Sequence, residues 1–363
     1  MNTIRGPAFS TKLLTWYDRE QRALPWRRKP SAYHTLVSEL MLQQTGVATV
    51  VPYFERFVAR FSTLRALAAA KEDEVLALWS GLGYYSRARN LHRTARMVVE
   101  EMGGELPANE EDLRKLPGIG AYTAAAVAAI AFSQRTLPVD GNVARVLARL
   151  LGERRSIDRP VVRAGLGLQG LPLVPSRRPG DFAQAMMELG ARCCLPHHPT
   201  CPLCPVSRFC RARAEGTTVT IPARSKRPKK RHIHLVCVAV ERRGQLLLVQ
   251  RPVGALLART WTLPLQELQP NETVDQAGRR TLTEMGLRLQ GPLTPLGEIR
   301  AIFTHRDATA LVLRARTSGK LRRSDSRWVR AGEWASLALS TFSRKTLELT
   351  RTKPFASTRG VRG

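Results

Sequence analysis

The chain has 363 residues, and its 58 Lys and Arg residues against 29 Asp and Glu residues give a formal net charge of +29 at pH 7. The length favours two domains, and the charge favours a polyanionic partner. No run approaches ~20 apolar residues, and the N-terminus lacks the apolar core of a signal peptide, so we expect a bacterial cytoplasmic protein, associated with the nucleoid and without membrane contact.

The N-terminal part, from residue 10 to about 150, spaces its apolar residues as amphipathic helices do, for example in TLVSELMLQQTGVATVVPYFERF. The breaks between these helical runs carry Pro and Gly. The segment 152–180 is richer in Pro and Gly and is expected to be looser, and it leads into another helix, DFAQAMMELGARCC. We therefore predict a mainly α-helical first domain over residues 1–223.

Glu39 lies in the predicted helix TLVSELMLQQT, where Leu36, Leu40 and Leu42 make its surroundings apolar. A solvated helix acid is one interpretation of this residue. An apolar environment would instead raise the pKa of its carboxyl, and a protonated Glu could then act as an acid near neutral pH.

A tight turn with two glycines, Gly118 and Gly120, directly precedes an alanine-rich helix. Backbone N–H groups at such a helix N-terminus can hold a phosphate without reading sequence. About 20 residues later, Asp140 precedes Gly141, Asn142 and a helical run, so it can be an N-cap, and the cap is compatible with a catalytic role. A protonated Glu39 and an ionised Asp140 across a C–N glycosidic bond would form an arrangement suited to glycosyl cleavage.

One short loop has the spacing C-x6-C-x2-C-x5-C, formed by Cys194, Cys201, Cys204 and Cys210. Four thiolates can hold either a 4Fe–4S cluster or a zinc ion. Because the loop has only one C-x2-C pair, the spacing favours an iron–sulfur cluster with a structural role. Of the remaining cysteines, Cys193 is expected to pack in a helix and Cys237 in a strand.

The segment RSKRPKKR at 224–231 is basic and has no apolar pattern, which predicts an exposed linker. The following HLVCVAVERRGQLLLVQRP has two apolar runs around RRGQ and predicts a β-hairpin, and ALVLRART near residue 310 predicts another strand. These elements indicate a smaller α+β domain over residues 232–363.

Together, PWR, SELMLQQT, LWSGLGYYSRARNL, LPGIGAYTA, VDGNVARV, QAMMELG and the four-cysteine loop resemble the helix-hairpin-helix DNA glycosylases, and within them the adenine-specific MutY branch. The resemblance covers about residues 15 to 215. It implies a base-excision repair enzyme that carries a 4Fe–4S cluster and acts, as a monomer, on duplex DNA with adenine opposite 8-oxoguanine or guanine.

The resemblance also implies roles for the catalytic residues. Glu39 would protonate N7 of adenine, Asp140 would stabilise the sugar cation, and Asn142 would orient Asp140 or the attacking water. Tyr122 stands where bifunctional relatives carry a Schiff-base lysine, which implies removal of the base alone. Lys115 lies before the hairpin, at a position that the family does not use as a nucleophile.

The same resemblance implies DNA contacts. Arg27 and Gln184 would contact the extruded adenine, and Gln44 and Tyr84 would fill the gap that it leaves in the duplex. Gln44 and Tyr84 would thus act as wedges in the base stack, with Gln43, Thr45 and Leu82 beside them. Base extrusion needs such wedges because unstacking costs a few kcal/mol.

The C-terminal region resembles a Nudix-like domain used to inspect 8-oxoguanine. Its RRTLTEMGL segment keeps Glu284 and Gly286, but Arg280 and Thr283 stand where acidic metal ligands would be needed, so nucleotide hydrolysis is not expected. The resemblance assigns reading of the damaged base to Phe303, Thr304 and His305.

Two other functions are compatible with parts of the sequence. A bifunctional pyrimidine glycosylase/lyase would share the fold, but Tyr122 and the added C-terminal domain argue against it. A non-catalytic iron–sulfur DNA-binding redox sensor would have no use for the pair Glu39 and Asp140.

Overall fold

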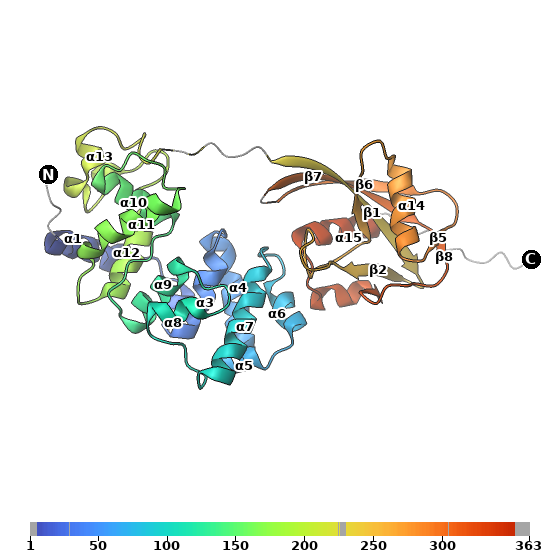
Figure 1. Ribbon diagram of the computed structural model, residues 1–363, viewed down its shortest axis with the longest axis horizontal. Coiled ribbons are helices and arrows are strands. Elements are labelled where there is room, and N and C mark those ends of the chain that lie inside the picture. Colours follow the sequence, from blue (N-terminus) through green and yellow to red (C-terminus); the bar gives the residue numbers. More distant parts are fainter. Residues whose placement is uncertain (1–5, 29, 224, 226–229, 304, 353–363) are drawn as a thin grey trace, which may run out of the picture. The chain divides into compact units, whose positions relative to one another are not determined.

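A computed structural model describes residues 6–28, 30–223, 225, 230–303 and 305–352, and the chain divides into two compact units. The first unit comprises Met1–Ala69 and Arg87–Arg227, and the second comprises Ala70–Ser86 and Pro228–Gly363. Figure 1 shows that the first unit is helical, whereas the second is built on a sheet. Within the described ranges, no helix has the length and apolar character needed to cross a bilayer. Most of the expected linker at 224–231 lies outside the described residues.

The first unit consists of helices and short 3-10 turns. Its helices are α1 (Gly6–Glu20), α2 (Pro25–Arg28), α3 (Ala32–Leu42), α4 (Val47–Arg60), α5 (Leu64–Ala68), α7 (Ser86–Glu101, whose first residue belongs to the second unit), α8 (Glu110–Lys115), α9 (Ala121–Phe132), α10 (Gly141–Leu151), α11 (Pro160–Gly170), α12 (Pro179–Arg192) and α13 (Arg211–Ala214). The 3-10 turns are η1 (Leu171–Leu173), η2 (Cys201–Leu203) and η3 (Ser207–Phe209).

Helix α9 is the centre of this unit, and it contacts α3, α8 and α12. Its residues from Thr123 to Ala129 are all buried, and five of these seven are alanines. Because an alanine adds little bulk, neighbouring helices can pack closely on every side of α9. A core of apolar residues from α1, α10, α11 and α12 lies beside it, with Phe9, Leu147, Leu166 and Phe182 fully or almost fully buried.

Two helical runs of the sequence are interrupted in the structure. The run from 35 to 57 breaks between α3 and α4, where Gln44 has a φ of 58°. The segment EVLALWSGLGYYSRARNLHRTARMVVEEM at 74–102, whose apolar residues also have helical spacing, breaks before α7, where Tyr84 has a φ of 49°. The segment 152–180, expected to be loose, contains the regular helix α11. Pro160 at the start of α11 supplies a helical φ, and Val162 and Leu166 bury one face of it.

The second unit contains helix α6 (Glu72–Trp79) and a seven-stranded mixed sheet with the central order β3-β2-β1-β7-β6. The strands of this unit are β1 (Arg231–Arg242), β2 (Gln245–Gln250), β3 (Trp261–Thr262), β4 (Leu265–Glu267), β5 (Arg288–Leu289), β6 (Thr294–Ile302), β7 (Arg306–Ala315), β8 (Thr317–Ser318) and β9 (Ser326–Val329). Strand β4 pairs with β1 and β9 pairs with β2, while β5 and β8 form a separate two-stranded sheet. Strands β1 and β7 run parallel, in register from Arg231 opposite Arg306 to Val240 opposite Ala315.

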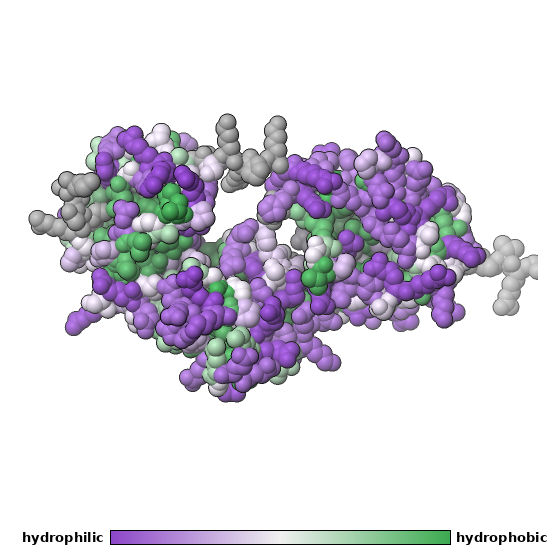
Figure 2. Space-filling view, viewed as in Figure 1, coloured by the Kyte–Doolittle hydropathy of each residue, from purple (hydrophilic) through white to green (hydrophobic). Residues whose placement is uncertain are grey.

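The predicted hairpin and the predicted strand near 310 are confirmed as β1–β2 and β7. Arg243 and Gly244 form the turn with φ values of 52° and 73°, the left-handed pair of a two-residue hairpin. Helix α14 (Val274–Glu284) packs against β1, whereas α15 (Thr341–Thr352) packs against β6 and β7, and η4 (Ala331–Ser336) precedes α15. Figure 2 shows hydrophilic side chains over most of the viewed face of both units, as the net charge predicts.

Candidate active site

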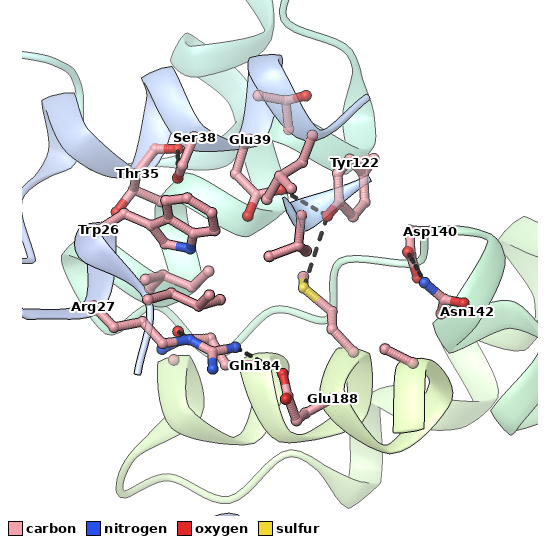
Figure 3. Close-up of a pocket in the computed structure, with 18 of the residues that line it drawn as sticks. Trp26, Arg27, Thr35, Ser38, Glu39, Tyr122, Asp140, Asn142, Gln184 and Glu188 are labelled. Carbon is pink, nitrogen blue, oxygen red and sulfur yellow. Dashed lines mark hydrogen bonds and ion pairs between the residues drawn. The ribbon is translucent and has the colours of Figure 1, made fainter. Parts of the chain in front are cut away.

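A cavity of about 1150 Å³ opens in the first unit, between α2 and α3 on one side and α12 and the start of α10 on the other (Figure 3). Eleven of the residues singled out from the sequence line it. They are Arg27, Glu39, Gln43, Gln44, Thr45, Gly118, Gly120, Tyr122, Asp140, Asn142 and Gln184. Residues up to 157 positions apart in the chain therefore meet in one place, as in the contact between Arg27 and Gln184.

Glu39 projects into this cavity from α3, a helix held rigid by burial of Leu36, Val37, Leu40 and Met41. The carboxyl is itself buried, and burial raises the pKa of Glu39 to about 7. The charge of Asp140 adds to that rise, while a hydrogen bond from Tyr122 and the charge of Arg27 oppose it. Glu39 can therefore hold and release a proton near neutral pH, as its apolar surroundings in the sequence predicted.

Tyr122, on the first turn of α9, donates its hydroxyl proton to Oε2 of Glu39 at 2.6 Å. It follows the turn of the hairpin between α8 and α9, where Gly118 has a φ of 74° and a Cβ would lie 2.4 Å from Asn90. Lys115 ends α8 instead, pairs with Asp112 at 2.6 Å, and is not among the residues that line the cavity. The residue nearest to the acid on this side is thus a phenol, which cannot form an imine.

Asp140 is the N-cap of α10, as the sequence predicted, and Oδ1 accepts a hydrogen bond from the backbone N–H of Val143 at 2.7 Å. Its Oδ2 accepts from Nδ2 of Asn142 at 3.1 Å. Burial raises the pKa of Asp140 although these hydrogen bonds oppose the rise. On the facing helix α12, a Cβ at Gly190 would lie 2.7 Å from Cβ of Asn142, so α10 and α12 approach this closely only because residue 190 is a glycine.

Arg27, in α2, reaches α12: it donates from Nε to Oε1 of Gln184 at 2.9 Å and from Nη2 to Oε2 of Glu188 at 3.1 Å. Figure 3 shows this group around the α12 side of the cavity. Sequence reasoning missed Glu188, although it lies in the QAMMELG segment. An acidic residue on an amphipathic helix is usually expected on the exposed face, so nothing in the sequence indicated that Glu188 is buried.

The loop after α3 forms the rim of the cavity and carries Gln43, Gln44 and Thr45. Nη1 of Arg87 donates to the carbonyl oxygens of Leu40, Met41 and Gln43 at 2.6–2.8 Å. Capping of the last α3 carbonyls by a buried cation holds the rim in one conformation.

Residues 37–166 match the HhH-GPD superfamily base excision DNA repair protein, and residues 235–349 match the NUDIX domain. Human adenine DNA glycosylase is 38% identical over 406 residues, which cover 94% of this chain and 74% of the human protein. The Rattus norvegicus enzyme of that name is 38% identical over 401 residues, covering 94% and 78%. A solved thermostable thymine-DNA glycosylase superposes with a TM-score of 0.53 at 28% identity, covering 58% of this chain and 96% of its own.

The chain belongs to the adenine DNA glycosylase family. It is therefore a DNA-binding enzyme of base excision repair, a monofunctional hydrolase of N-glycosyl bonds. The helical fold predicted for the first domain is confirmed as the HhH-GPD fold, and the α+β fold of the second is confirmed as Nudix-like. Glu39, the hairpin and Asp140 all lie within residues 37–166.

Two residues expected at the DNA lie in the second unit, in the segment before α7. Leu82 is buried, and Tyr84 is 41% exposed. Tyr84 adopts its positive φ between Gly83, with a φ of 73°, and the start of α7. The turn thus presents an aromatic ring on a strained backbone, a combination found at functional sites.

The four cysteines of the C-x6-C-x2-C-x5-C loop line one small cavity of about 30 Å³, together with Cys193. In the part of the chain that the structure describes, no group of three or more His, Cys, Asp or Glu residues is arranged to hold a metal. The donor set nevertheless fits a thiolate-bound cluster, because the four thiols line one cavity. Nη1 of the buried Arg149 donates to Sγ of Cys194 at 3.3 Å, and this contact opposes the rise that burial gives to the pKa of Cys194. Cys237 is fully buried in β1, as expected.

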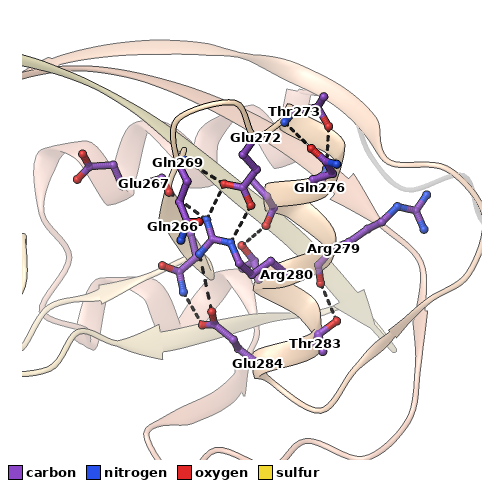
Figure 4. A network of polar contacts seen from close by, with 12 residues as sticks. Gln266, Glu267, Gln269, Glu272, Thr273, Gln276, Arg279, Arg280, Thr283 and Glu284 are labelled. Carbon is purple, nitrogen blue, oxygen red and sulfur yellow. Dashed lines mark hydrogen bonds and ion pairs between the residues drawn. The ribbon is translucent and has the colours of Figure 1, made fainter.

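In the second unit, Arg280 of the RRTLTEMGL segment lies at the centre of a network of polar contacts (Figure 4). Its guanidinium donates to both carboxylate oxygens of Glu272, at 2.8 and 2.9 Å, and to the carbonyl oxygen of Glu267 at 3.0 Å. Glu284 lies 3.8 Å from it and accepts a hydrogen bond from Gln266. A fixed cation thus neutralises Glu272 and lies close to Glu284, so both carboxylates already have a cationic partner.

Of the residues expected to read the damaged base, Thr304 lies outside the described residues. Phe303 packs against Phe342 of α15 with ring centroids 6.1 Å apart, and its carbonyl oxygen accepts a hydrogen bond from Lys230 at 2.8 Å. His305 is exposed, and its carbonyl oxygen accepts from the backbone N–H of Arg231. Its imidazole is therefore presented at the end of a packed sheet.

Proposed function

We propose that this enzyme removes adenine from duplex DNA where adenine is mispaired with 8-oxoguanine or guanine. The observation that carries the proposal is the pairing, in one cavity, of a carboxyl that is protonatable near pH 7 with a second carboxylate fixed on a helix N-cap. Cleavage of a glycosidic bond through a cation-like state needs these two groups.

Glu39 donates its proton to N7 of adenine, and the bond between C1′ and N9 breaks with its electron pair going to the base. The sugar cation that remains is stabilised by the carboxylate of Asp140, which Asn142 holds at 3.1 Å. Water adds its oxygen to C1′, and its proton returns to Glu39. Tyr122 orients Glu39 through the 2.6 Å hydrogen bond and takes no part as a nucleophile.

For this reaction the adenine has to leave the stack and enter the cavity. Arg27 and Gln184, which line it, contact the extruded base, while Gln44 and Tyr84 occupy the gap in the duplex with Gln43, Thr45 and Leu82 beside them. Backbone N–H groups near Gly118 and Gly120 bind a phosphate at the start of α9.

Cys194, Cys201, Cys204 and Cys210 hold a 4Fe–4S cluster whose role is structural. Purified protein is expected to be brown and to contain about four irons per chain. Stoichiometric zinc without iron would contradict this assignment.

In the second unit, Phe303, Thr304 and His305 contact 8-oxoguanine, so that this unit discriminates the damaged base.

The test is incubation with a duplex carrying a single adenine opposite 8-oxoguanine, followed by alkali. A strand break at the adenine position supports the proposal, and an intact strand contradicts it. A break that forms without alkali, together with borohydride trapping of protein on DNA, would favour a bifunctional lyase. Tight binding without any base release would favour an iron–sulfur redox sensor.

A further inference from the structure

Glu188, in α12, is a completely buried acid that lines the active-site cavity and has no role in the steps described above. Its Oε1 accepts from Nε of Arg22 at 2.6 Å, and its Oε2 accepts from Nη2 of Arg22 at 3.0 Å and Nη2 of Arg27 at 3.1 Å. Burial opposes ionisation, but the two guanidinium groups outweigh it and hold the pKa of Glu188 below its usual range. A buried carboxylate is stable only with such partners, so this one is committed to the two arginines.

The contacts of Arg27 fix its guanidinium from three directions. Besides Glu188, it donates from Nε to Oε1 of Gln184 at 2.9 Å and from Nη1 to the carbonyl oxygen of Arg22 at 3.0 Å. Its cationic carbon lies 5.6 Å from the ring centroid of Tyr17. Because a guanidinium is planar and has five N–H donors, these bonds set its orientation and leave two N–H groups for a ligand.

The orientation of Arg27 determines that of the Gln184 amide. A guanidinium can only donate, so the atom of Gln184 that faces Nε has to be the carbonyl oxygen. The NH2 group of the same amide is then left to donate elsewhere. The wall formed by Arg27 and Gln184 therefore offers N–H donors to a base, and it matches an unprotonated ring nitrogen, as adenine has at N1, rather than the N1–H of guanine.

We propose that Glu188 is a positioning residue for base recognition, which acts by holding Arg27 and, through Arg27, the donor orientation of Gln184. This inference rests on the proposed function, because it names how the same cavity recognises its base. It predicts that the identity of residue 188 affects base release while leaving the affinity for DNA as such unchanged.

The experiment is a double-mutant cycle of Glu188→Gln and Arg27→Lys in the full chain. The substrate is the duplex with adenine opposite 8-oxoguanine, and single-turnover base release, duplex affinity and melting temperature are measured. Glu188→Gln should slow base release about 10- to 100-fold, because hydrogen bonds worth ~1–3 kcal/mol are misdirected. The double variant should be no more than ~3-fold slower than Arg27→Lys alone, since both changes break the same set of hydrogen bonds between Glu188, Arg27 and Gln184.

Glu153→Gln is the matched control. Glu153 also pairs with an arginine, Arg155 at 2.6 Å, and its side chain is only 16% exposed, but it does not line the cavity. It should release adenine at the wild-type rate. If Glu188→Gln does not fold, Glu188→Asp replaces it in the cycle, because that variant keeps the charge but is one methylene too short to reach both arginines.

The outcomes separate this inference from the proposed function. If the wild-type enzyme releases no adenine, the proposed function itself is wrong. If it does, and residue 188 variants release adenine at the wild-type rate, the positioning role alone is wrong. Losses from the two single variants that multiply in the double variant, or a loss of duplex affinity equal to the loss of rate, would also overturn it.

Discussion

Glu39 in the first unit and Glu272 in the second are carboxyl groups whose pKa values are shifted in opposite directions. In the first unit, Glu39 is buried, receives one hydrogen bond from a phenol, and has its pKa raised to about 7. In the second unit, the Arg280 guanidinium holds the pKa of Glu272 below its usual range and binds both its oxygens. The comparison teaches that the environment of a carboxyl, not its presence in a motif, decides whether it can hold a proton near pH 7 or stays ionised in an ion pair.

Replacing Glu39, the proposed general acid, should have the largest effect on base release. Glu39→Gln keeps the size and shape of the side chain but cannot donate a proton to the base, so single-turnover base release should fall about 100- to 10,000-fold. Affinity for the mismatched duplex should stay close to wild type. A variant that released adenine at the wild-type rate would remove Glu39 from the mechanism.

The second unit should contribute discrimination rather than cleavage. A double Thr304→Ala and His305→Ala variant should lose about 10- to 100-fold of its preference for adenine opposite 8-oxoguanine over adenine opposite guanine, because a few hydrogen bonds of ~1–3 kcal/mol are lost. Both substrates are measured at one salt concentration, since phosphate contacts are salt-dependent. Ile302→Ala, a neighbouring exposed position, is the control and should keep the ratio. An unchanged ratio in the double variant would assign recognition to the first unit.

The hydroxyl of Tyr122 should shift the pKa of Glu39 and with it the pH dependence of base release. In the proposed mechanism base release requires protonated Glu39, so its rate should fall as the pH rises through about 7. The hydrogen bond from Tyr122 lowers the pKa of Glu39, and Tyr122→Phe should therefore raise that pKa and move the alkaline limb of the pH–rate profile to higher pH. Single-turnover rates from pH 5 to 9 measure the shift. A limb that stays in place, or moves to lower pH, would show that Tyr122 does not act through this hydrogen bond.

Removing the ion pair between Arg280 and Glu272 should have the smallest effect, and that effect should be on stability alone. Arg280→Met removes the cation that holds Glu272 and is expected to lower the melting temperature by about 2–4 °C, without altering base release. Arg279→Met is the control, because Arg279 makes a single exposed pair with Asp275 on the same helix. Equal melting temperatures for the two variants would mean that the Arg280 network contributes nothing beyond an ordinary surface pair.

The sequence predicted the raised pKa of Glu39 and the N-cap at Asp140 because their signals are local. The leucines around Glu39 lie within one helical turn of it, and the position of Asp140 before a helical run indicates an N-cap directly. It did not predict the breaks at Gln44 and Tyr84, since both residues adopt a left-handed backbone that their residue types do not favour. The helix α11 was missed because its glycines weaken the helical pattern.

Glu188 and the Arg280 network could not be predicted for a different reason. Arg27 and Glu188 are 161 positions apart, and Arg280 reaches a carboxylate eight residues away on the preceding loop. Which of several acids an arginine meets depends on how helices and strands pack, and that information is not contained in spacing along one element. The family resemblance supplied Arg27 and Gln184 but not the acid that holds them.

The close approach at Gly190 has a consequence for any genetic screen of this enzyme. A side chain there would collide with Asn142 and push α12 away from the helix that carries Asp140. A survey that scores loss of repair should therefore rank position 190 beside the acid and the carboxylate, although its side chain is a single hydrogen atom. Sites of inactivation in this chain will include residues whose contribution is the space that they leave empty.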